Sequence, residues 1–211
     1  MTRKPVTALI VVDLQNDFVP GGALAVNEGH RIIPLVDELL SLPFDVKVAT
    51  KDWHPKNHGS FAQTHGKRTG DVIILQGIEQ ILWPTHCVQG SLGADFASGW
   101  NTNKIEKVFH KGTETHIDSY STFFDNGHLH ATGLEEYLRK KSVTDVYLVG
   151  LATDYCVKYS VLDACKLGFN TYVIVDACRG VNLKPQDTEQ ALQEMKAAGA
   201  HLVMSNDITE L

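Results

Sequence analysis

Three side chains that could act as a base, a positive charge and a nucleophile each come just after a short apolar segment of the sequence. Asp13 comes after residues 7–12, Lys111 comes after residues 105–109, and Cys156 lies shortly after a third such segment. A lone aspartate at such a place more often caps a turn, and a lone lysine is usually a solvated surface charge. Together, the three offer a base, a positive charge that favours a thiolate or a carboxylate, and a nucleophile. The combination favours hydrolysis through a covalent intermediate on a cysteine.

Cys156 is the best nucleophile candidate among the four cysteines. It follows a glycine-led turn, and a helix is expected to begin near residue 153. The first helical turn has free backbone N–H groups, which lower the pKa of a thiol. Cys165 and Cys178 are better interpreted as buried, inert residues. The chain contains no CxxC pair and too few cysteines for a disulfide framework, which indicates a reducing cytoplasm.

A second group of side chains is suited to a divalent metal. Asp52 and His54 lie two residues apart just after an apolar segment, and His86 lies further along. Carboxylate and imidazole ligands with open positions fit zinc, iron or manganese. Any one of these histidines alone is more simply interpreted as a structural residue, since the chain holds 10. His58 could close the site as a fourth ligand, and the sequence leaves that open.

The elements that must position these side chains alternate between strand and helix. Strands are expected at residues 7–12, 46–50, 105–109, 146–149, 171–175 and 201–204, and helices at 30–42, 154–167 and 187–198. This alternation predicts an α/β protein with three layers, α/β/α, around a doubly wound, mainly parallel and Rossmann-like sheet of about six strands. In such sheets, ligands bind beyond the carboxyl ends of the strands, where each candidate residue falls.

The whole chain, residues 1–211, is expected to form one domain. Residues 51–103 carry the metal candidates but only weak helix or strand signals, and loops of this length are usually functional. The longest apolar run has five residues, too short to span a membrane or to form a signal-peptide core. The net charge of −6 and the lack of long basic runs make nucleic acid a poor partner. A dinucleotide-binding or P-loop glycine motif is also missing.

Five sequence blocks, in order, carry a family resemblance. They are DLQNDF at 13–18, DWHP at 52–55, WPTHCV at 83–88, FHKG at 109–112 and GLATDYCV at 150–157. With these blocks, the sequence resembles the bacterial nicotinamidases, within the isochorismatase-like cysteine hydrolase superfamily, from about residue 8 to about residue 204. The resemblance implies an isochorismatase-like fold. It also implies hydrolysis of nicotinamide to nicotinate and ammonia through a cysteine thioester, in NAD salvage, with pyrazinamide as a further substrate.

The resemblance also implies roles for particular residues. The catalytic triad would be Asp13, Lys111 and Cys156, and one divalent metal, with zinc the first choice, would be held by Asp52, His54 and His86. His58 or Ser60 lies where some members recruit a further ligand. The metal would hold the ring nitrogen of the substrate, between Phe18 and Trp83. A cis peptide bond is implied between Leu151 and Ala152, and the N–H groups of Ala152 and Cys156 are the expected oxyanion donors.

Three other functions compete with this interpretation. Relatives that act on carbamoyl or ureido substrates generally lack the set of Asp52, His54 and His86. Isochorismatase-type hydrolases typically lack the cysteine, so Cys156 argues against them. A non-catalytic metal or redox protein would need neither Asp13 nor a lysine, and its thiols should pair. The expected partner is therefore a small molecule, and the sequence leaves open whether the chain forms a homo-oligomer.

Overall fold

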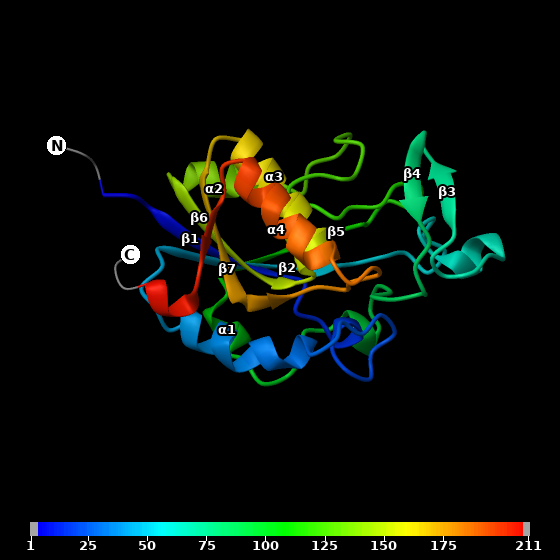
Figure 1. Cartoon of the computed structure of the whole chain (residues 1–211), viewed down its shortest axis with the longest axis horizontal. Coiled ribbons are helices and arrows are strands. Elements are labelled where there is room, and N and C mark those ends of the chain that lie inside the picture. Colours follow the sequence, from blue (N-terminus) through cyan, green and yellow to red (C-terminus); the bar gives the residue numbers. More distant parts are fainter. Residues whose placement is uncertain (1–3, 209–211) are drawn as a thin grey trace.

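The computed structural model describes residues 4–208, and within them six parallel strands form the central sheet (Figure 1). The strand order is β5-β2-β1-β6-β7-β8. The bounds are Thr7–Val12 for β1, Val46–Asp52 for β2, Lys107–Lys111 for β5, Asp145–Leu151 for β6, Asn170–Arg179 for β7 and His201–Val203 for β8. The chain winds outward from β1 in one direction and then from β6 in the other. The predicted doubly wound sheet of about six strands is confirmed, and its switch point lies between β1 and β6.

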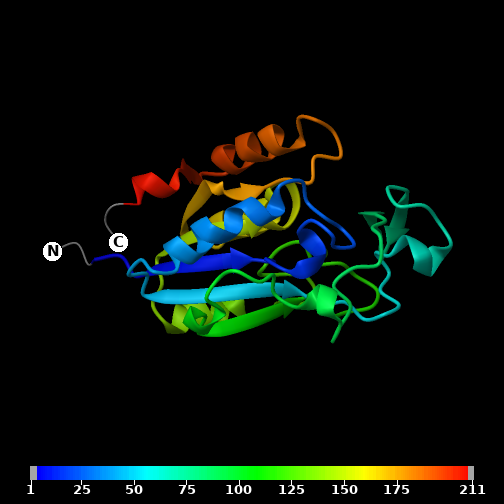
Figure 2. The same ribbon diagram turned by 90° about the horizontal axis from the view of Figure 1, so that it is seen from below.

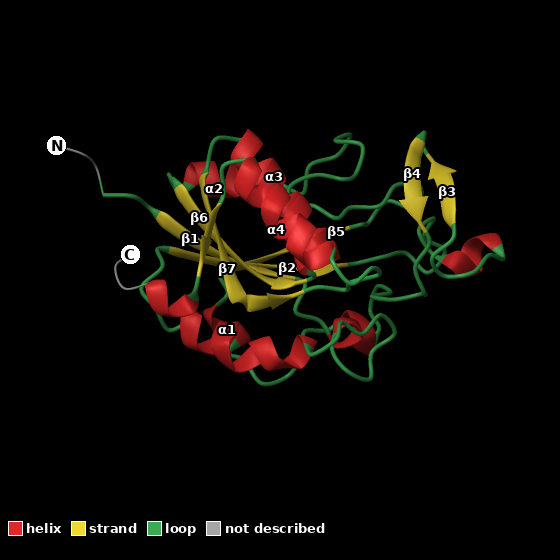
Figure 3. Ribbon diagram, in the orientation of Figure 1, coloured by secondary structure: helices red, strands yellow, loops and turns green. Residues whose placement is uncertain are grey.

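Helices cover both faces of this sheet, as Figure 3 shows. Helix α1 (Ile33–Leu39) lies on one face, and α2 (Leu134–Lys140), α3 (Lys158–Lys166) and α4 (Asp187–Ala197) lie on the other. The side chains of β1 alternate between the two layers: Ala8, Ile10 and Val12 pack with α2, α3 and α4, and Leu9 and Val11 pack with α1. Every β1 side chain is buried, which explains the continuous apolar run that predicted this strand.

The predicted strands and helices are present, with ends that differ by a few residues. The structure also contains elements that were not predicted. The predicted helix at 154–167 begins as a π-helical turn, Thr153–Val157, and continues as α3. Helix α2 had no counterpart among the predictions. The segment 51–103 contains a hairpin of β3 (Val72–Leu75) and β4 (Ile78–Ile81). Figure 2 shows this hairpin at the end of the molecule opposite the chain termini.

The helices of the described residues, 4–208, include none that is long and apolar enough to cross a membrane.

Candidate active site and metal centre

The carboxyl ends of four neighbouring strands bring the candidate residues together. Asp13 directly follows β1, Asp52 ends β2, Lys111 ends β5, and Cys156 lies in the turn after β6. Asp52 and Lys111 are register partners in the β2–β5 ladder. A carboxylate oxygen of Asp13, one of Asp52 and the Cys156 sulfur lie within 4.8 Å of one another. Side chains far apart in sequence therefore share one buried site at the switch point of the sheet.

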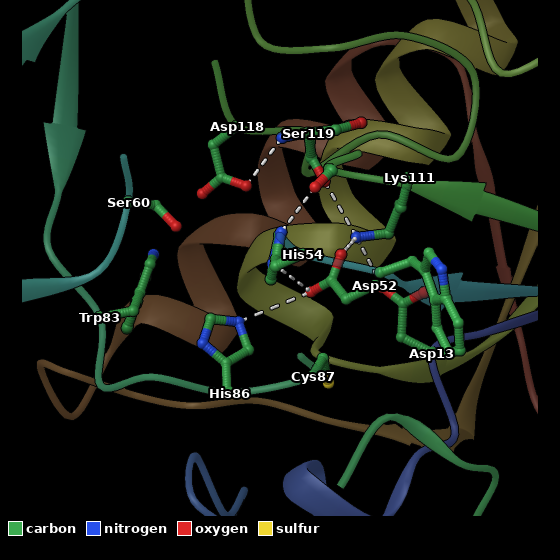
Figure 4. Close-up of polar contacts among 12 residues, drawn as sticks. Asp13, Asp52, His54, Ser60, Trp83, His86, Cys87, Lys111, Asp118 and Ser119 are labelled. Atoms are coloured by element: carbon green, nitrogen blue, oxygen red, sulfur yellow. Dashed lines mark hydrogen bonds and ion pairs between the residues drawn. The ribbon is translucent and has the colours of Figure 1, made fainter. Parts of the chain in front are cut away.

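Lys111 is the centre of this group, as Figure 4 shows for its carboxylate partners. Its Nζ lies 2.8 Å from Asp13 Oδ2 and 3.3 Å from Cys156 Sγ, and it also donates to Asp52 Oδ1. A further hydrogen bond of 2.9 Å goes to the carbonyl oxygen of Ser119. Asp13 is held from its other side by Thr50, whose hydroxyl donates to Asp13 Oδ1 at 2.6 Å. The ammonium group of Lys111 thus contacts the candidate nucleophile, the candidate base Asp13 and the candidate metal ligand Asp52.

Burial and the charges of neighbouring groups together shift the pKa values of these side chains. It raises the pKa of Asp13 and holds the pKa of the Cys156 thiol well above its ordinary value, while Lys111 opposes both shifts. Burial alone would lower the pKa of Lys111, but the carboxylates of Asp13 and Asp52 outweigh it and hold that pKa well above its usual value. The prediction that a helix start lowers the thiol pKa is wrong, because desolvation dominates. The charge of Lys111 thus favours the thiolate of Cys156 against the desolvation that opposes it.

Asp52, His54 and His86 form a compact group of ligand atoms, all within 4.8 Å of one another. Asp52 Oδ2 lies 3.6 Å from His54 Nε2 and 3.7 Å from His86 Nε2 (Figure 4). Burial alone would raise the pKa of Asp52, but Lys111 and His54 outweigh burial and hold it well below its usual range. An ionised carboxylate with two imidazoles is a donor set that suits a divalent metal.

Both histidines are oriented by their second ring nitrogen. His54 Nδ1 lies 2.8 Å from the carbonyl oxygen of Gly112, and His86 Nδ1 lies 2.8 Å from that of Pro84. Each carbonyl accepts the Nδ1 proton, so in the neutral ring Nε2 carries the free lone pair and faces Asp52. Gly112 has a φ of +63°, and a Cβ there would lie 2.3 Å from His54 Cε1, so glycine is required beside the imidazole. The residues present therefore fit a metal.

His58 and Ser60, both left open by the sequence, bond to each other. His58 Nδ1 lies 2.7 Å from Ser60 Oγ and accepts from the Ser60 N–H at 3.2 Å, while Nε2 lies 3.2 Å from the Ile117 carbonyl oxygen. Its ring lies against His54 with centroids 4.2 Å apart. Burial, followed by the charge of His54, lowers the pKa of His58 to about 4. In this arrangement both ring nitrogens of a neutral His58 are occupied by protein partners.

A pocket is lined by Cys156 and by two of the metal candidates, Asp52 and His86. Phe18 and Trp83, the expected ring walls, line it together with Ala152 and Cys156. The peptide bond between Leu151 and Ala152 is cis, as the resemblance implies. The expected oxyanion residues, Ala152 and Cys156, therefore lie at the same pocket as the expected walls for the substrate ring.

Sequence reasoning missed two tyrosines of this pocket. Tyr155 packs edge-on against Trp83, with ring centroids 4.9 Å apart, and Tyr120 accepts a hydrogen bond of 3.0 Å from Trp83 Nε1. Tyr155 stands within the GLATDYCV block, beside the nucleophile candidate, and this proximity was a usable signal. Tyr120 and Ser119 come from residues 112–133, a segment without a motif, and only the fold brings them to the site.

Comparisons with known proteins agree on one family. The isochorismatase domain model matches residues 7–207. The nicotinamidase of Escherichia coli is 47% identical over 209 residues, covering 98% of each chain. A nicotinamidase–pyrazinamidase structure from Acinetobacter baumanii superposes with a TM-score of 0.93 at 45% identity, covering 98% of this chain and 100% of that one. The pyrazinamidase of Pyrococcus horikoshii in complex with zinc gives 0.77 at 41% identity, covering 95% and 99%.

Proposed function

The chain belongs to the isochorismatase family, and we propose that it is an amidase that hydrolyses nicotinamide to nicotinate and ammonia. The observation that carries this proposal is the position of Lys111. Its Nζ contacts Cys156 Sγ, Asp13 Oδ2 and Asp52 Oδ1 at once, next to an aromatic pocket. A nucleophile, a base and a metal-binding carboxylate thus meet around one ammonium group, within reach of one small ligand.

In the first half of the reaction, Cys156 Sγ attacks the carboxamide carbon while Asp13 accepts the thiol proton. Lys111 keeps its positive charge beside both groups and stabilises the charge that moves between them. The N–H groups of Ala152 and Cys156 donate to the oxygen that becomes negative. Collapse of this intermediate breaks the C–N bond, and the proton held by Asp13 leaves with ammonia. The product at this stage is a thioester on Cys156.

In the second half, water attacks the thioester carbon and Asp13 takes a proton from it. The C–S bond then breaks, nicotinic acid leaves and ionises to nicotinate in water, and the proton held by Asp13 returns to the sulfur of Cys156. Both halves use the same base, so Asp13 must alternate between its two protonation states. Its raised pKa brings those states closer in free energy, which suits a group that both accepts and returns a proton.

Asp52, His54 and His86 would hold one divalent metal, and we propose zinc, with iron or manganese as alternatives. When bound, the metal supplies a Lewis-acid site for the ring nitrogen of the substrate. Phe18 and Trp83 would flank the ring and fix its plane. Pyrazinamide also carries a ring nitrogen and a carboxamide, so it should be a second substrate.

The proposed setting is a single catalytic domain that acts on a small molecule in NAD salvage, in the cytoplasm. The four cysteines, all unpaired in the structure, support a reducing compartment. The group of Asp52, His54 and His86 argues against a relative that acts on carbamoyl or ureido substrates.

The proposal is tested by the release of ammonia from nicotinamide. We expect turnover by the purified enzyme, its loss after chelation, and its return on addition of zinc. The chelated enzyme should keep its circular dichroism spectrum, which shows that the loss is not unfolding. The absence of ammonia release from enzyme loaded in turn with zinc, iron and manganese would overturn the proposal.

Asp13→Asn and Lys111→Ala should each lower kcat by ~10²–10⁴-fold, since each removes a charged group that the proton transfer needs. Both side chains serve the same step and touch each other at 2.8 Å. The double variant should therefore lose far less than the product of the two single losses. The measurement is the kcat of the four proteins in the ammonia assay.

Lys107→Ala is the matched control for this cycle. Lys107 lies on β5 like Lys111, but its side chain is exposed over the rings of Phe109 and Tyr137. We expect its kcat to equal that of the unmodified enzyme. Additive losses, on a logarithmic scale, in the variants of Asp13 and Lys111 would show that these residues do not act as one unit.

A further inference from the structure

Gln15 is a fully buried side chain bonded to the backbone of the metal candidate Asp52. Its Oε1 accepts the Asp52 N–H at 2.8 Å, and its Nε2 donates to the Asp52 carbonyl oxygen at 2.9 Å. A second bond from Nε2, also 2.9 Å, goes to the carbonyl oxygen of Ala94. Both N–H groups of the amide are therefore used, and two of the three bonds go to one residue.

The amide of Gln15 stands where a neighbouring strand would be. On one side, Asp52 pairs with Lys111 of β5. On the other side, β1 pairs with β2 only as far as Ala49, because the chain of β1 then turns away. The side chain of Gln15 supplies the missing donor and acceptor three residues further along β2. It thereby fixes the backbone from which Asp52 presents Oδ1 to Lys111 and Oδ2 to the histidines.

Asp17, two residues after Gln15, bonds to the backbone next to another metal candidate, His86. Its Oδ2 accepts the N–H of Cys87 at 2.7 Å, and its Oδ1 accepts that of Ala23 at 3.1 Å. Cys87 adopts a left-handed φ of +45°, which disfavours residues other than glycine and needs support from its surroundings. Because Cys87 directly follows His86, this bond fixes the backbone that carries the second histidine.

We propose that Gln15 and Asp17 are positioning residues of the metal site. These two residues of one short segment after β1 bond to the backbone of Asp52 and to the backbone next to His86. Asp52 and His86 lie 34 residues apart in sequence. Gln15 and Asp17 both act through the ligands, since their own side chains bond to backbone groups at these places. The inference rests on the proposed metal site and is independent of the identity of the substrate.

The test compares Gln15→Met, which keeps the length of the side chain without its hydrogen bonds, with Asp17→Asn, which loses the charge and one acceptor. Asn16→Ala is the matched control, because Asn16 lies between them and its side chain donates to the Leu92 carbonyl oxygen, away from both ligands. Zinc dissociation constants are measured by competition with a chromophoric chelator. We expect about 10–100-fold weaker zinc binding in the first two variants and unchanged binding in the control.

A second measurement separates positioning from a general loss of stability. The visible spectrum of bound Co²⁺ reports the ligand geometry, and thermal unfolding without metal reports the fold. We expect an altered Co²⁺ spectrum in Gln15→Met and Asp17→Asn even where the metal-free protein melts like the unmodified one. Should Gln15→Met fail to fold, Gln15→Glu keeps the acceptor for the Asp52 N–H and takes its place.

The two proposals fail in distinguishable ways. Folded variants of Gln15 and Asp17 with unmodified zinc affinity and an unmodified Co²⁺ spectrum would overturn the positioning role. An unmodified protein that binds neither ion would overturn the metal site itself.

Discussion

Replacing Cys156 with alanine is expected to lower the kcat for nicotinamide by roughly 10⁵-fold or more, because the covalent route disappears. Asp13 would have no thiol to deprotonate, and water would have to attack the amide directly. The pocket, Lys111 and the metal candidates would all remain, so binding of nicotinamide should survive. Single-turnover release of ammonia measures the loss, and circular dichroism verifies that the variant is folded.

Cys165→Ala is the matched control for this prediction. Cys165 lies on α3, the helix that continues from the turn of Cys156, and is more exposed than Cys156. Its removal should leave kcat unchanged. In acid-quenched reactions of the unmodified enzyme, we expect a nicotinoyl group on the peptide that contains Cys156. Near-normal turnover by Cys156→Ala, or an adduct on a different cysteine, would refute the assignment of the nucleophile.

Much of the fold could be predicted because the central strands β1 and β6 are buried on both faces. The residues of β1 are all buried, and such strands appear in the sequence as continuous runs of apolar residues. The hairpin of β3 and β4 was missed, although β3 is itself a run of four apolar residues, VIIL. Val72 and Ile74 on β3 are 56% and 67% exposed, so burial does not impose a pattern on them. Position outside the core does not explain every miss, because the unpredicted helix α2 contributes the fully buried Leu134 and Leu138 to the core.

The candidate site could be predicted at the ends of strands and within motifs, and less well elsewhere. Asp13, Asp52 and Lys111 lie where the rule for parallel sheets places ligands, and the structure brings them together. The carbonyl partner of Lys111, Ser119, comes from a loop whose path only tertiary packing decides. The raised pKa of Cys156 could not be predicted from the sequence either, because its cause is burial, and burial depends on residues from the whole chain.

The hydrogen bonds of Gln15 show a further limit of prediction from sequence. Gln15 stands in the DLQNDF block two residues after Asp13, but no role was predicted for it. Its hydrogen bonds join it to the backbone of Asp52, 37 residues away. A pattern can show that a residue belongs to a motif, but the backbone groups that its side chain satisfies follow only from the folded chain.

Benzamide, which lacks the ring nitrogen of nicotinamide, should be hydrolysed with a kcat/KM lower by roughly 10²–10⁴-fold. The reason is that a site built around a polar partner rejects the analogue that leaves that partner unsatisfied. Asp52 and His86, two of the three residues that would hold the metal, line the same pocket as Phe18. Both amides contain the same carboxamide, so attack by the thiol is equally available to both. The ratio of their kcat/KM values isolates recognition of the ring nitrogen.

His54→Ala should bring this ratio close to one, because the loss falls on nicotinamide and leaves benzamide almost unaffected. Chelation of the unmodified enzyme should do the same. The matched control is His65→Ala, since His65 lies in the same long segment but its Nε2 bonds to the carbonyl oxygen of Gly59, outside the metal candidates. That variant should keep the full preference for nicotinamide. Equal hydrolysis of both amides by the unmodified, zinc-loaded enzyme would show that the metal does not hold the ring, and Asp52, His54 and His86 would then form a structural site.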